Sequence, residues 1–307
     1  MKNGRILVIG SSNTDMTVKV KRLPLPGETV LGTSFTMGAG GKGANQAVAV
    51  KRLGGEVQFI CKVGNDIFGD NSVRHYAGEG LDTDKILRSN LPSGVALIPV
   101  DDQAENSIVV ASGANMDFSP ADIAACRAEI EACDILLMQL EIPVPAVLEA
   151  ARIAHAAGKY VILNPAPAAD LPEELFGLLS LFIPNETELS RFSGRDVRDE
   201  ASAEQAARAL QAKGVKDLIV TLGSKGSLVV PQGAPAVRVE AVRVEAVDTT
   251  GAGDTFCGAL CVALSEGKTL AEAARFAACA AALQVIRLGA QESIPTRAEM
   301  DRFAAQL

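Results

Sequence analysis

The sequence predicts an α/β fold with three layers (helix, sheet, helix) on a mainly parallel central sheet, together with a small β-sheet lid. Two observations predict the layers. Short continuous apolar runs such as residues 6–9 are typical of strands buried on both faces, and they alternate along the chain with helical segments. A third observation predicts the lid: four other stretches alternate apolar and polar residues, which is typical of a sheet with one solvated face.

The composition indicates a globular protein and disfavours two classes of partner. Apolar residues form 48% of the 307 residues, and the formal net charge is -8. An acidic protein is poorly suited to a polyanionic backbone, so we expect no nucleic-acid partner. The apolar runs are far shorter than the roughly 20 residues that cross a bilayer, so we expect no membrane partner. Residues 1–5 lead into the first apolar run without a signal sequence, which predicts a cytoplasmic protein.

The cysteines and histidines give little support to a zinc site or to nucleophilic catalysis. The six cysteines have no paired spacing typical of zinc ligands, and we expect them to be buried thiols. His75 and His155 both lie in helical stretches, and we expect both to be structural. A Ser-His or Cys-His catalytic pair is therefore not expected.

The predicted lid strands begin shortly after the first buried strand. Residues 6–9 form that strand, and a polar loop over residues 10–15 follows it. Alternating residues over 16–20, a Pro-Gly turn at 24–27 and a second alternating stretch over 29–36 then predict two strands of a different sheet.

A second pair of alternating stretches completes the lid. It covers residues 93–100 and 106–112, which the polar residues 101–105 separate. We therefore predict a lid drawn from about residues 14–37 and 93–112. No linker, low-complexity stretch or repeat divides the remainder, so residues 1–307 are interpreted as a single α/β domain that carries this lid.

Helices and buried strands alternate over the rest of the chain. Ser119, followed by Pro120 and Asp122, marks the start of one helix, and a capping box at residues 202–205 marks another. The predicted elements are helix 42–53, strand 57–62, helix 120–133, strand 134–140, helix 144–157, strand 160–163, strand 181–183, a helix from 202, strand 218–222 and helix 255–264.

Polar segments follow several of these strands. In an open parallel sheet, ligands gather outside the carboxyl ends of the strands, so these segments are the first candidates for a binding site. Five segments qualify: residues 13–15, 139–141, 184–188, 221–226 and 248–254.

The last segment, Asp-Thr-Thr-Gly-Ala-Gly-Asp, is the most informative. Gly251 and Gly253 precede the helical run 255–264, and backbone N–H groups at a helix N-terminus can bind an anion. Asp254 lies beside them and can accept a proton from a hydroxyl that attacks a phosphoryl group. The simpler alternative is that Asp254 only stabilises the helix dipole, worth about 0.3–1 kcal/mol, and its position alone favours this alternative.

A second glycine-rich segment, residues 38–43, formally matches the G-x-G-x-x-G pattern of dinucleotide-binding proteins. The match is weak, because the run before it is partly polar and Lys62 stands where an acidic ribose ligand is expected. It is not a Walker A loop, because Gly43 follows Lys42. Glycines that let a polyol approach the backbone fit better. Four compact polar side chains can supply donors and acceptors for sugar hydroxyls: Asn13, Asp15, Asn45 and Glu141.

Together these segments resemble the ribokinase family of carbohydrate kinases over residues 6–295. The two signatures of that family are similar to residues 38–46, Gly-Ala-Gly-Gly-Lys-Gly-Ala-Asn-Gln, and residues 248–256, Asp-Thr-Thr-Gly-Ala-Gly-Asp-Thr-Phe. Family members that act on free ribose are similar in further segments, namely residues 12–15, 24–29, 139–141, 164–168 and 289–291.

The resemblance implies a kinase that uses ATP to phosphorylate the primary 5-hydroxyl of D-ribose, giving ribose 5-phosphate and ADP. Asp254 would be the catalytic base, and Gly251, Ala252 and Gly253 would form the anion hole. The implied sugar contacts are Asn13, Thr14, Asp15, Gly41, Lys42, Gly43, Ala44, Asn45, Glu141 and Asp254. The implied ATP contacts are Asn185, Glu188, Thr221, Leu222, Gly223, Ser224, Lys225, Gly226, Gly253 and Ala278.

The resemblance also implies two metal ions and a partner subunit. Glu188 is similar to the residue that organises Mg²⁺ through water in this family. A monovalent cation, usually K⁺, would lie near Asp248, Thr250, Gln284, Arg287, Gly289 and Ser293. Related lids pair between subunits, which implies a homodimer. One departure is Ala278, which stands where related chains often carry Asn or His near the adenine.

Several alternatives stay open from the sequence. Another kinase of the same fold would act on deoxyribose, fructose, a keto-deoxy sugar acid or a nucleoside. The sugar-side motifs contain no arginine, which speaks against a sugar acid, and residues 13–15 and 164–168 favour a free sugar over a nucleoside. A different class is a sugar-binding regulator without turnover, against which the intact Asp254 speaks.

Overall fold

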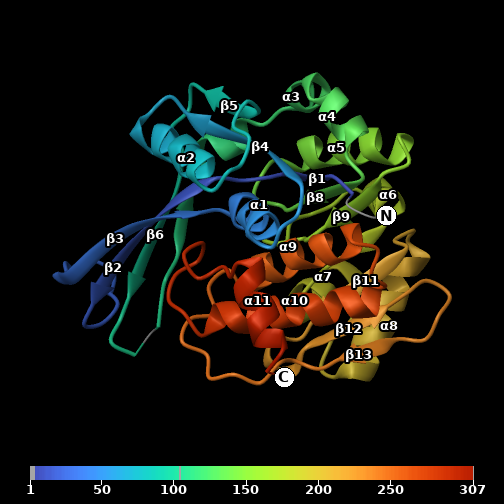
Figure 1. Ribbon diagram of the computed structural model, residues 1–307. Coiled ribbons are helices and arrows are strands. Elements are labelled where there is room, and N and C mark those ends of the chain that lie inside the picture. The colour runs from blue at the N-terminus through green and yellow to red at the C-terminus, as the bar shows by residue number, and fades with distance from the viewer. Residues whose placement is uncertain (1–3, 104, 307) are drawn as a thin grey trace.

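A computed structural model describes residues 4–103 and 105–306, and its strands form two separate sheets (Figure 1). Residues 1–3, within the N-terminal segment predicted to lack a signal sequence, and Ala104, within the predicted lid connection, lie outside the described residues. The predicted class, α/β with a mainly parallel large sheet and a small second sheet, is confirmed.

The large sheet has nine strands within the described residues, in the order β13-β12-β11-β10-β9-β8-β1-β4-β5. All neighbours from β11 to β5 pair in parallel, whereas β12 and β13 add an antiparallel edge. Its strands are β1 (Ile6–Ile9), β4 (Val57–Gly64), β5 (Ile86–Ser89), β8 (Ile135–Met138), β9 (Tyr160–Leu163), β10 (Leu181–Phe182), β11 (Asp217–Thr221), β12 (Ser227–Val230) and β13 (Val237–Val239).

Helices cover both faces of this sheet, which explains why its strands are continuously apolar. Within β1, Leu7 and Ile9 pack into the core on one face, and Ile6 and Val8 pack into the core on the other. The first face is covered by α3 (Pro120–Ala125), α4 (Arg127–Ala132), α5 (Val144–Ala156), α6 (Glu173–Leu178), α7 (Glu186–Ser193) and α8 (Glu200–Ala212). The second face is covered by α1 (Lys42–Arg52), α2 (Ile67–Gly78), α9 (Ala252–Ser265), α10 (Leu270–Val285) and α11 (Arg297–Ala304).

The small sheet extends from one side of the molecule (Figure 1). Its strand order is β3-β2-β6-β7, so all four predicted lid stretches join one sheet. The strands are β2 (Asn13–Val20), β3 (Gly32–Gly40), β6 (Gly94–Val100) and β7 (Val109–Ala111). The assignment of both sheets to a single domain stays a prediction.

Several predicted boundaries are wrong. The helix expected over 120–133 breaks at Cys126, whose N–H bonds to Ile123 O at 3.0 Å. Because Ile123, Cys126 and Ile130 all remain buried across the break, their spacing looks like that of one helix.

Other boundaries shift for local reasons. Helix α8 starts at Glu200 instead of residue 202, because Asp199 is its N-cap and accepts from Ser202 N at 2.8 Å. The expected loop over 10–15 is shorter, since β2 already begins at Asn13. The edge strands β5 and β13, the adjacent strand β12 and helices α2, α6, α7, α10 and α11 were not among the predicted elements.

Two further expectations concern the membrane and the cysteines. Within residues 4–103 and 105–306, none of the helices combines the length and apolarity that a bilayer crossing requires. All six cysteines are unbridged and buried, as expected.

Candidate active site

The two glycine-rich segments singled out in the sequence meet at the carboxyl ends of the parallel strands. Asp254 lies in the first turn of α9 and is only 6% exposed. Its Oδ2 accepts a hydrogen bond from Asn45 Nδ2 at 2.9 Å, although 209 residues separate the two in the sequence. The fold therefore joins the predicted base to the first glycine-rich segment.

The first glycine-rich segment forms the turn into α1 and packs against the loop after β1. Gly41 is the N-cap of α1, with φ at 90°. A Cβ on Gly43 would lie 2.5 Å from Ser11 N, so this glycine makes room for the chain's own backbone. Ala44 is buried, and its N–H donates to Ser11 O at 2.9 Å. Gly43 and Ala44 thus set the position of the α1 N-terminus.

The start of α9 is shaped by two glycines with different roles. Gly251 is the N-cap with φ at 76°, and a Cβ there would also lie 2.9 Å from Gln284 Nε2. Gly253 has no neighbouring atom within 4 Å of its ideal Cβ position. The helix N-terminus is therefore open at Gly253, where its backbone N–H groups can face an anion.

Lys42 and Glu141 lie beside this helix start. Glu141 Oε2 accepts hydrogen bonds from Ser11 Oγ at 2.5 Å and from Lys42 N at 3.0 Å. The carboxylate of Asp254 is the main cause that raises the pKa of the Lys42 ammonium, with Glu141 and Glu188 adding to it against the effect of burial. Lys42 is therefore a fixed positive charge among these carboxylates.

Two side chains of β2 face this region. Asn13 Oδ1 accepts from Asn115 Nδ2 at 2.7 Å, so the Asn13 amide nitrogen remains available for a ligand. Burial, followed by the charges of Glu141, Glu292 and Asp254, raises the pKa of Asp15 to about 6. Thr14 lies between them, and strand alternation directs its side chain to the opposite face of the sheet.

The predicted nucleotide residues lie at the carboxyl ends of β10 and β11. Asn185 and Glu188 form the capping box of α7, in which Asn185 Oδ1 accepts from Glu188 N at 2.8 Å. Glu188 Oε2 in turn accepts from Asn185 N at 2.9 Å. Burial raises the pKa of Glu188, against the opposing effects of the Asn185 N–H and the Lys42 charge. One carboxylate oxygen of Glu188 is thus used by the cap, and the other remains for a ligand.

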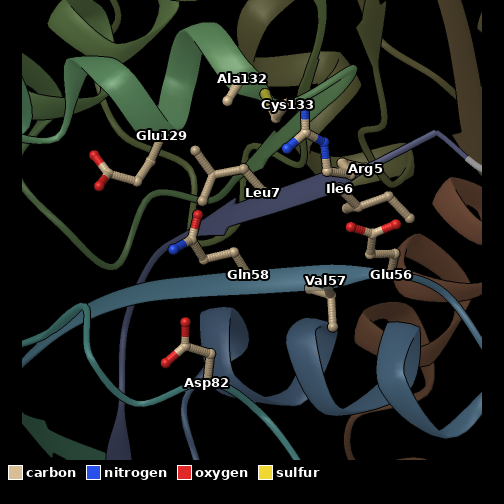
Figure 2. Close-up of a pocket in the computed structure, with 10 residues that line it drawn as sticks. All are labelled: Arg5, Ile6, Leu7, Glu56, Val57, Gln58, Asp82, Glu129, Ala132 and Cys133. Atoms are coloured by element: carbon tan, nitrogen blue, oxygen red, sulfur yellow. The ribbon is translucent and has the colours of Figure 1, made fainter.

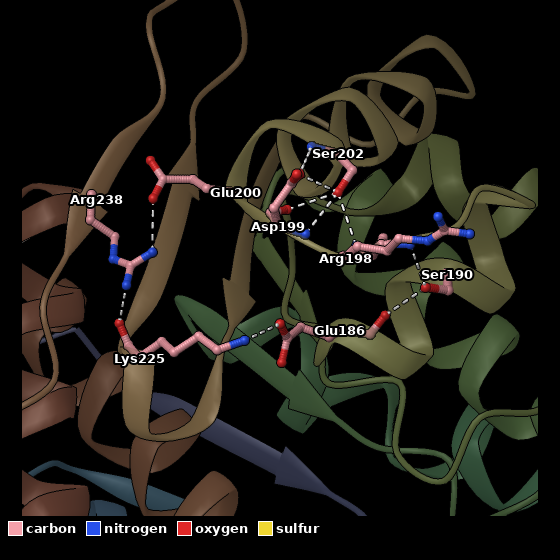
Figure 3. Close-up of polar contacts among 9 residues, drawn as sticks. Glu186, Ser190, Arg198, Asp199, Glu200, Ser202, Lys225 and Arg238 are labelled. Carbon is pink, nitrogen blue, oxygen red and sulfur yellow. Dashed lines mark hydrogen bonds and ion pairs between the residues drawn. The ribbon is translucent and has the colours of Figure 1, made fainter.

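The segment 221–226 forms the short 3-10 turn η2 (Gly223–Lys225) next to α7. Thr221 bridges to Asn185, and Leu222 N donates to Gly226 O at 2.8 Å. Lys225 Nζ pairs with Glu186 at 3.3 Å (Figure 3). Gly223 and Ser224 lie on the exposed surface of this turn.

Arg238 supports the same turn from β13. Its guanidinium donates to Lys225 O and pairs with Glu200 at 2.8 Å (Figure 3). Ala278 is partly buried in α10 and packs against the core. Its methyl side chain has no hydrogen-bonding group to offer a nucleotide.

The segments predicted for a monovalent cation also come together. Asp248 accepts from Thr250 N at 2.9 Å and from Gly289 N at 3.0 Å, and these bonds outweigh burial and lower its pKa. Gln284 Nε2 donates to Thr250 O at 2.8 Å and to Ala290 O at 3.2 Å.

Two further residues of that prediction differ in their placement. Ser293 Oγ donates to Ala290 O at 2.8 Å and so belongs to the cluster. The Arg287 side chain instead pairs with Glu299 on α11 at 2.8 Å, which leaves only its backbone for a cation. Within the described residues, no group of three or more His, Cys, Asp and Glu side chains is placed to hold a metal ion.

Comparison with known proteins identifies the family. The pattern of the pfkB family of carbohydrate kinases matches residues 3–297. The chain belongs to this family. It is a kinase that transfers a phosphoryl group to a sugar hydroxyl.

Relatives of this kinase are similar over almost their whole length. A ribokinase of Haemophilus influenzae is 45% identical over 299 residues, which cover 97% of each chain. A deoxyribokinase of Salmonella typhi is 37% identical over 300 residues, covering 97% of this chain and 98% of the relative. The structure of an Arabidopsis thaliana ribokinase complexed with ribose and ATP is 35% identical, with a TM-score of 0.90 and 99% of each chain covered.

Several residues of the kinase site were missed by sequence reasoning. Gln46 donates to Asp254 Oδ1 at 3.0 Å, Gln291 donates to Asn45 Oδ1 at 3.0 Å, and Asn115 holds Asn13. The sequence does offer one signal, because the polar Gln46 shares a helix face with the apolar residues Ala49, Val50 and Leu53.

A separate cavity lies at the opposite, amino ends of β1 and β4 (Figure 2). It has a volume of about 250 Å³ and is lined by Arg5, Ile6, Leu7, Glu56, Val57, Gln58, Asp82, Glu129, Ala132 and Cys133. None of the predicted sugar, nucleotide or cation residues lines it. The residues predicted for the chemistry lie at the other end of the strands, with Asp254.

Proposed function

We propose that this kinase transfers the γ-phosphoryl group of ATP to the primary 5-hydroxyl of D-ribose. The products are ribose 5-phosphate and ADP. The observation that carries the proposal is the Asp254 carboxylate at the open N-terminus of α9, hydrogen-bonded to Asn45 at 2.9 Å. The Haemophilus influenzae ribokinase and the ribose and ATP complex of the Arabidopsis thaliana ribokinase support ribose as the acceptor.

The side chains around Asp254 suit a small polyol. Sugar hydroxyls both donate and accept, and a pocket that recognises them needs both kinds of partner. The Asn13 amide nitrogen supplies a donor, because Asn115 occupies its carbonyl oxygen. Asp15 and Asp254 supply acceptors. Glu141 and Asn45 act partly through their partners, since Glu141 holds Ser11 and the Lys42 backbone.

The transfer step uses groups that the chain already holds in place. Asp254 takes the proton of the attacking hydroxyl as the new oxygen–phosphorus bond forms and the bond to the β-phosphate oxygen breaks. The backbone N–H of Gly253, with the Lys42 ammonium, faces the charge on the transferring phosphoryl group, whereas Ala252 N donates to Thr249 O at 3.2 Å in the ligand-free protein. Asn185 and the turn 221–226 hold the nucleotide.

The donor atoms present suit the two implied cations. The free carboxylate oxygen of Glu188 is a hard ligand that can orient Mg²⁺ through water. Mg²⁺ would supply charge neutralisation on the phosphates. Near Asp248, the carbonyls of Thr250 and Ala290 provide hard oxygen atoms, and the buried Oε1 of Gln284 has no hydrogen-bond partner among the described residues. These oxygen atoms fit K⁺.

The small sheet supports the proposed homodimer. Its register places Met16, Met37, Leu97 and Val109 in one row on the face opposite Asp15. Met37 is 56% exposed and Val109 is 62% exposed, so this apolar row faces solvent in a single subunit. A second copy of the chain would cover it. The same sheet, acting as a lid over the sugar, would exclude water from the transferring group.

Two other functions are compatible with parts of the site. A deoxyribose kinase is favoured by the 37% identity to the Salmonella typhi deoxyribokinase. A sugar-binding regulator without turnover is disfavoured, because Asp254 and the open helix N-terminus are both in place. A cytoplasmic location fits a chain that uses ATP.

An assay of ADP release tests the proposal. Purified protein is supplied with MgATP and a panel of ribose, deoxyribose, fructose, keto-deoxy sugar acids and nucleosides, each with and without K⁺. We expect ribose to give the highest kcat/KM and K⁺ to increase it. A higher kcat/KM with deoxyribose or a nucleoside would assign the kinase to that substrate instead, and no turnover with any sugar would leave the regulator.

A further inference from the structure

We propose that Gln46 is a positioning residue that fixes the direction of the Asp254 carboxylate for proton transfer. This inference rests on the proposed function, because it assigns Gln46 a task in that same reaction. Gln46 lies on α1 and is fully buried. Its Nε2 donates to Asp254 Oδ1 at 3.0 Å.

Every hydrogen-bonding group of the Gln46 amide is occupied. Besides Asp254, Nε2 donates to Asn164 Oδ1 at 3.1 Å, and Gln46 Oε1 accepts from Gln139 Nε2 at 2.5 Å. If the Gln46 amide were turned by about 180°, Oε1 would face the side-chain oxygens of Asp254 and Asn164, and Nε2 would face the amide nitrogen of Gln139. Only one orientation of Gln46 is therefore compatible with its neighbours.

The direction of this amide chain is set by the backbone. Asn164 Nδ2 donates to Ile183 O at 3.0 Å, and a backbone carbonyl can only accept. Asn164 must then direct its Oδ1 to Gln46, and Gln46 must in turn direct its amide nitrogen to Asp254. The end of β10 thus determines which atom of Gln46 meets the base.

A parallel arrangement holds the other carboxylate oxygen. Asn45 Nδ2 donates to Asp254 Oδ2, and Gln291 Nε2 fixes Asn45 by donating to its Oδ1 at 3.0 Å. Each oxygen of Asp254 accepts one N–H from an amide whose own orientation is determined. Amides cannot take up the proton, so the carboxylate is presented as an acceptor to the sugar hydroxyl.

Burying this network of amides costs more free energy than burying apolar side chains of the same size. Gln139 Oε1 is buried without a hydrogen-bond partner among the described residues, and an apolar residue at position 46 would avoid burying these amides. A ligand-free structural role does not explain a glutamine there. Orientation of Asp254 does, because small displacements of a catalytic group reduce rates strongly.

The test uses the full-length kinase with ribose and MgATP. Gln46→Met keeps the volume and removes the donors, and we expect kcat to fall about 100-fold while KM for ribose changes little. Gln46→Glu adds a carboxylate beside Asp254, and we expect the acid limb of the kcat profile to move to higher pH. The titratable groups that already lie near Asp254 are Lys42, Asp15 and the neutral Cys257 thiol, and all three are unchanged in both variants.

Controls separate this role from structure and from the proposed function. Gln205→Glu adds the same charge on the exposed face of α8 and should leave kcat and its pH profile unchanged. Gln139→Met leaves Gln46 in place but removes the donor to its Oε1, so Asn164 and Asp254 alone hold the amide, and we expect a smaller loss of kcat. It also decides the question if position 46 variants fail to fold.

The outcomes are distinguishable. If the wild type turns over ribose, Asp254→Asn is inactive, and the variants at positions 46 and 139 keep kcat within about 2-fold with an unmoved pH profile, the positioning role is wrong and the proposed function stands. If the wild type turns over no sugar, the proposed function fails, whatever the variants do.

Discussion

The buried, ionised carboxylate of Asp15 destabilises the ligand-free protein at neutral pH. Its pKa rises from 3.8 to about 6, first because it is buried and then because Glu141, Glu292 and Asp254 lie near it. The folded state therefore holds a proton that the unfolded chain has already lost over this pH range. Stability falls as the pH rises from 3.8 towards about 6, and it stays lower above that range.

We predict that Asp15→Asn stabilises the ligand-free protein and abolishes sugar affinity. Removal of the ionisable group should raise the free energy of unfolding at pH 8 by up to about 3 kcal/mol, with almost no effect below pH 4. Urea denaturation of both proteins at the two pH values measures the difference. A variant that is less stable than wild type at pH 8 would contradict this assignment of Asp15.

The residues of the site were predictable from the sequence to different degrees. Asp254 and Asn45 were found because each lies in a glycine-rich segment, which marks a backbone that must approach something closely. Gln46 and Gln291 were not, because their partners lie 208 and 246 residues away and only the fold brings them together. A side chain's partner across such a separation leaves no local pattern.

At the scale of elements, the candidate site forms where α1 and α9 meet. Gly258 on α9 allows the approach, because a Cβ there would lie 2.7 Å from Ala49 Cβ on α1. The start of α9 remains open on the ligand side at Gly253. The two helices therefore pack closely at Gly258, whereas the N-terminus of α9 is open to a ligand at Gly253.

We predict that Gly253→Ala separates stability from activity. The new methyl group enters open space and improves helix propensity, so the free energy of unfolding should be unchanged or higher by up to about 1 kcal/mol. The same methyl occupies the position where a phosphoryl group would meet the helix N-terminus, so kcat/KM should fall at least about 10-fold. Thermal unfolding and ADP release on the same preparation measure both effects.

Gly251→Ala is the matched comparison. Its φ of 76° and the nearby Gln284 amide make a side chain unfavourable there, so we expect a loss of stability as well as of activity. Equal losses of stability in the two alanine variants would show that Gly253 is a structural glycine like Gly251.

The elements were predicted best where packing and pattern agree. The central strands are recognisable because both of their faces are buried, and the small sheet is recognisable because its faces differ. The break at Cys126 was missed because the buried residues keep a helical spacing across it. Strand β5 was missed because its edge position leaves a short, mixed sequence.

At the scale of the whole molecule, the small sheet has one polar and one apolar face. The polar face carries Asn13 and Asp15 towards the proposed sugar site, and the apolar face carries Met16, Met37 and Leu97 away from it. Covering the apolar face with a second subunit would therefore also stabilise the strand that carries the sugar ligands.

We predict that Leu97→Asp weakens the proposed dimer. A charge at the centre of the apolar row should increase the dimer dissociation constant at least about 10-fold, because it would be buried without a partner. Analytical ultracentrifugation over a range of concentrations measures the constant. Lys19→Asp, near the end of β2 and on the opposite face of the same sheet, controls for a new charge. A wild-type protein that stays monomeric at all concentrations would contradict the proposed interface.

The proposed mechanism depends most on Asp254, and single-turnover rapid quench tests the role of this residue directly. Asp254→Asn keeps the shape of the side chain but cannot take a proton. We predict that phosphoryl transfer from ATP to ribose slows by about 100- to 10,000-fold, while ribose binding measured by calorimetry changes little. A variant that transfers the phosphoryl group within about 10-fold of the wild-type rate would show that another group, or none, acts as the base.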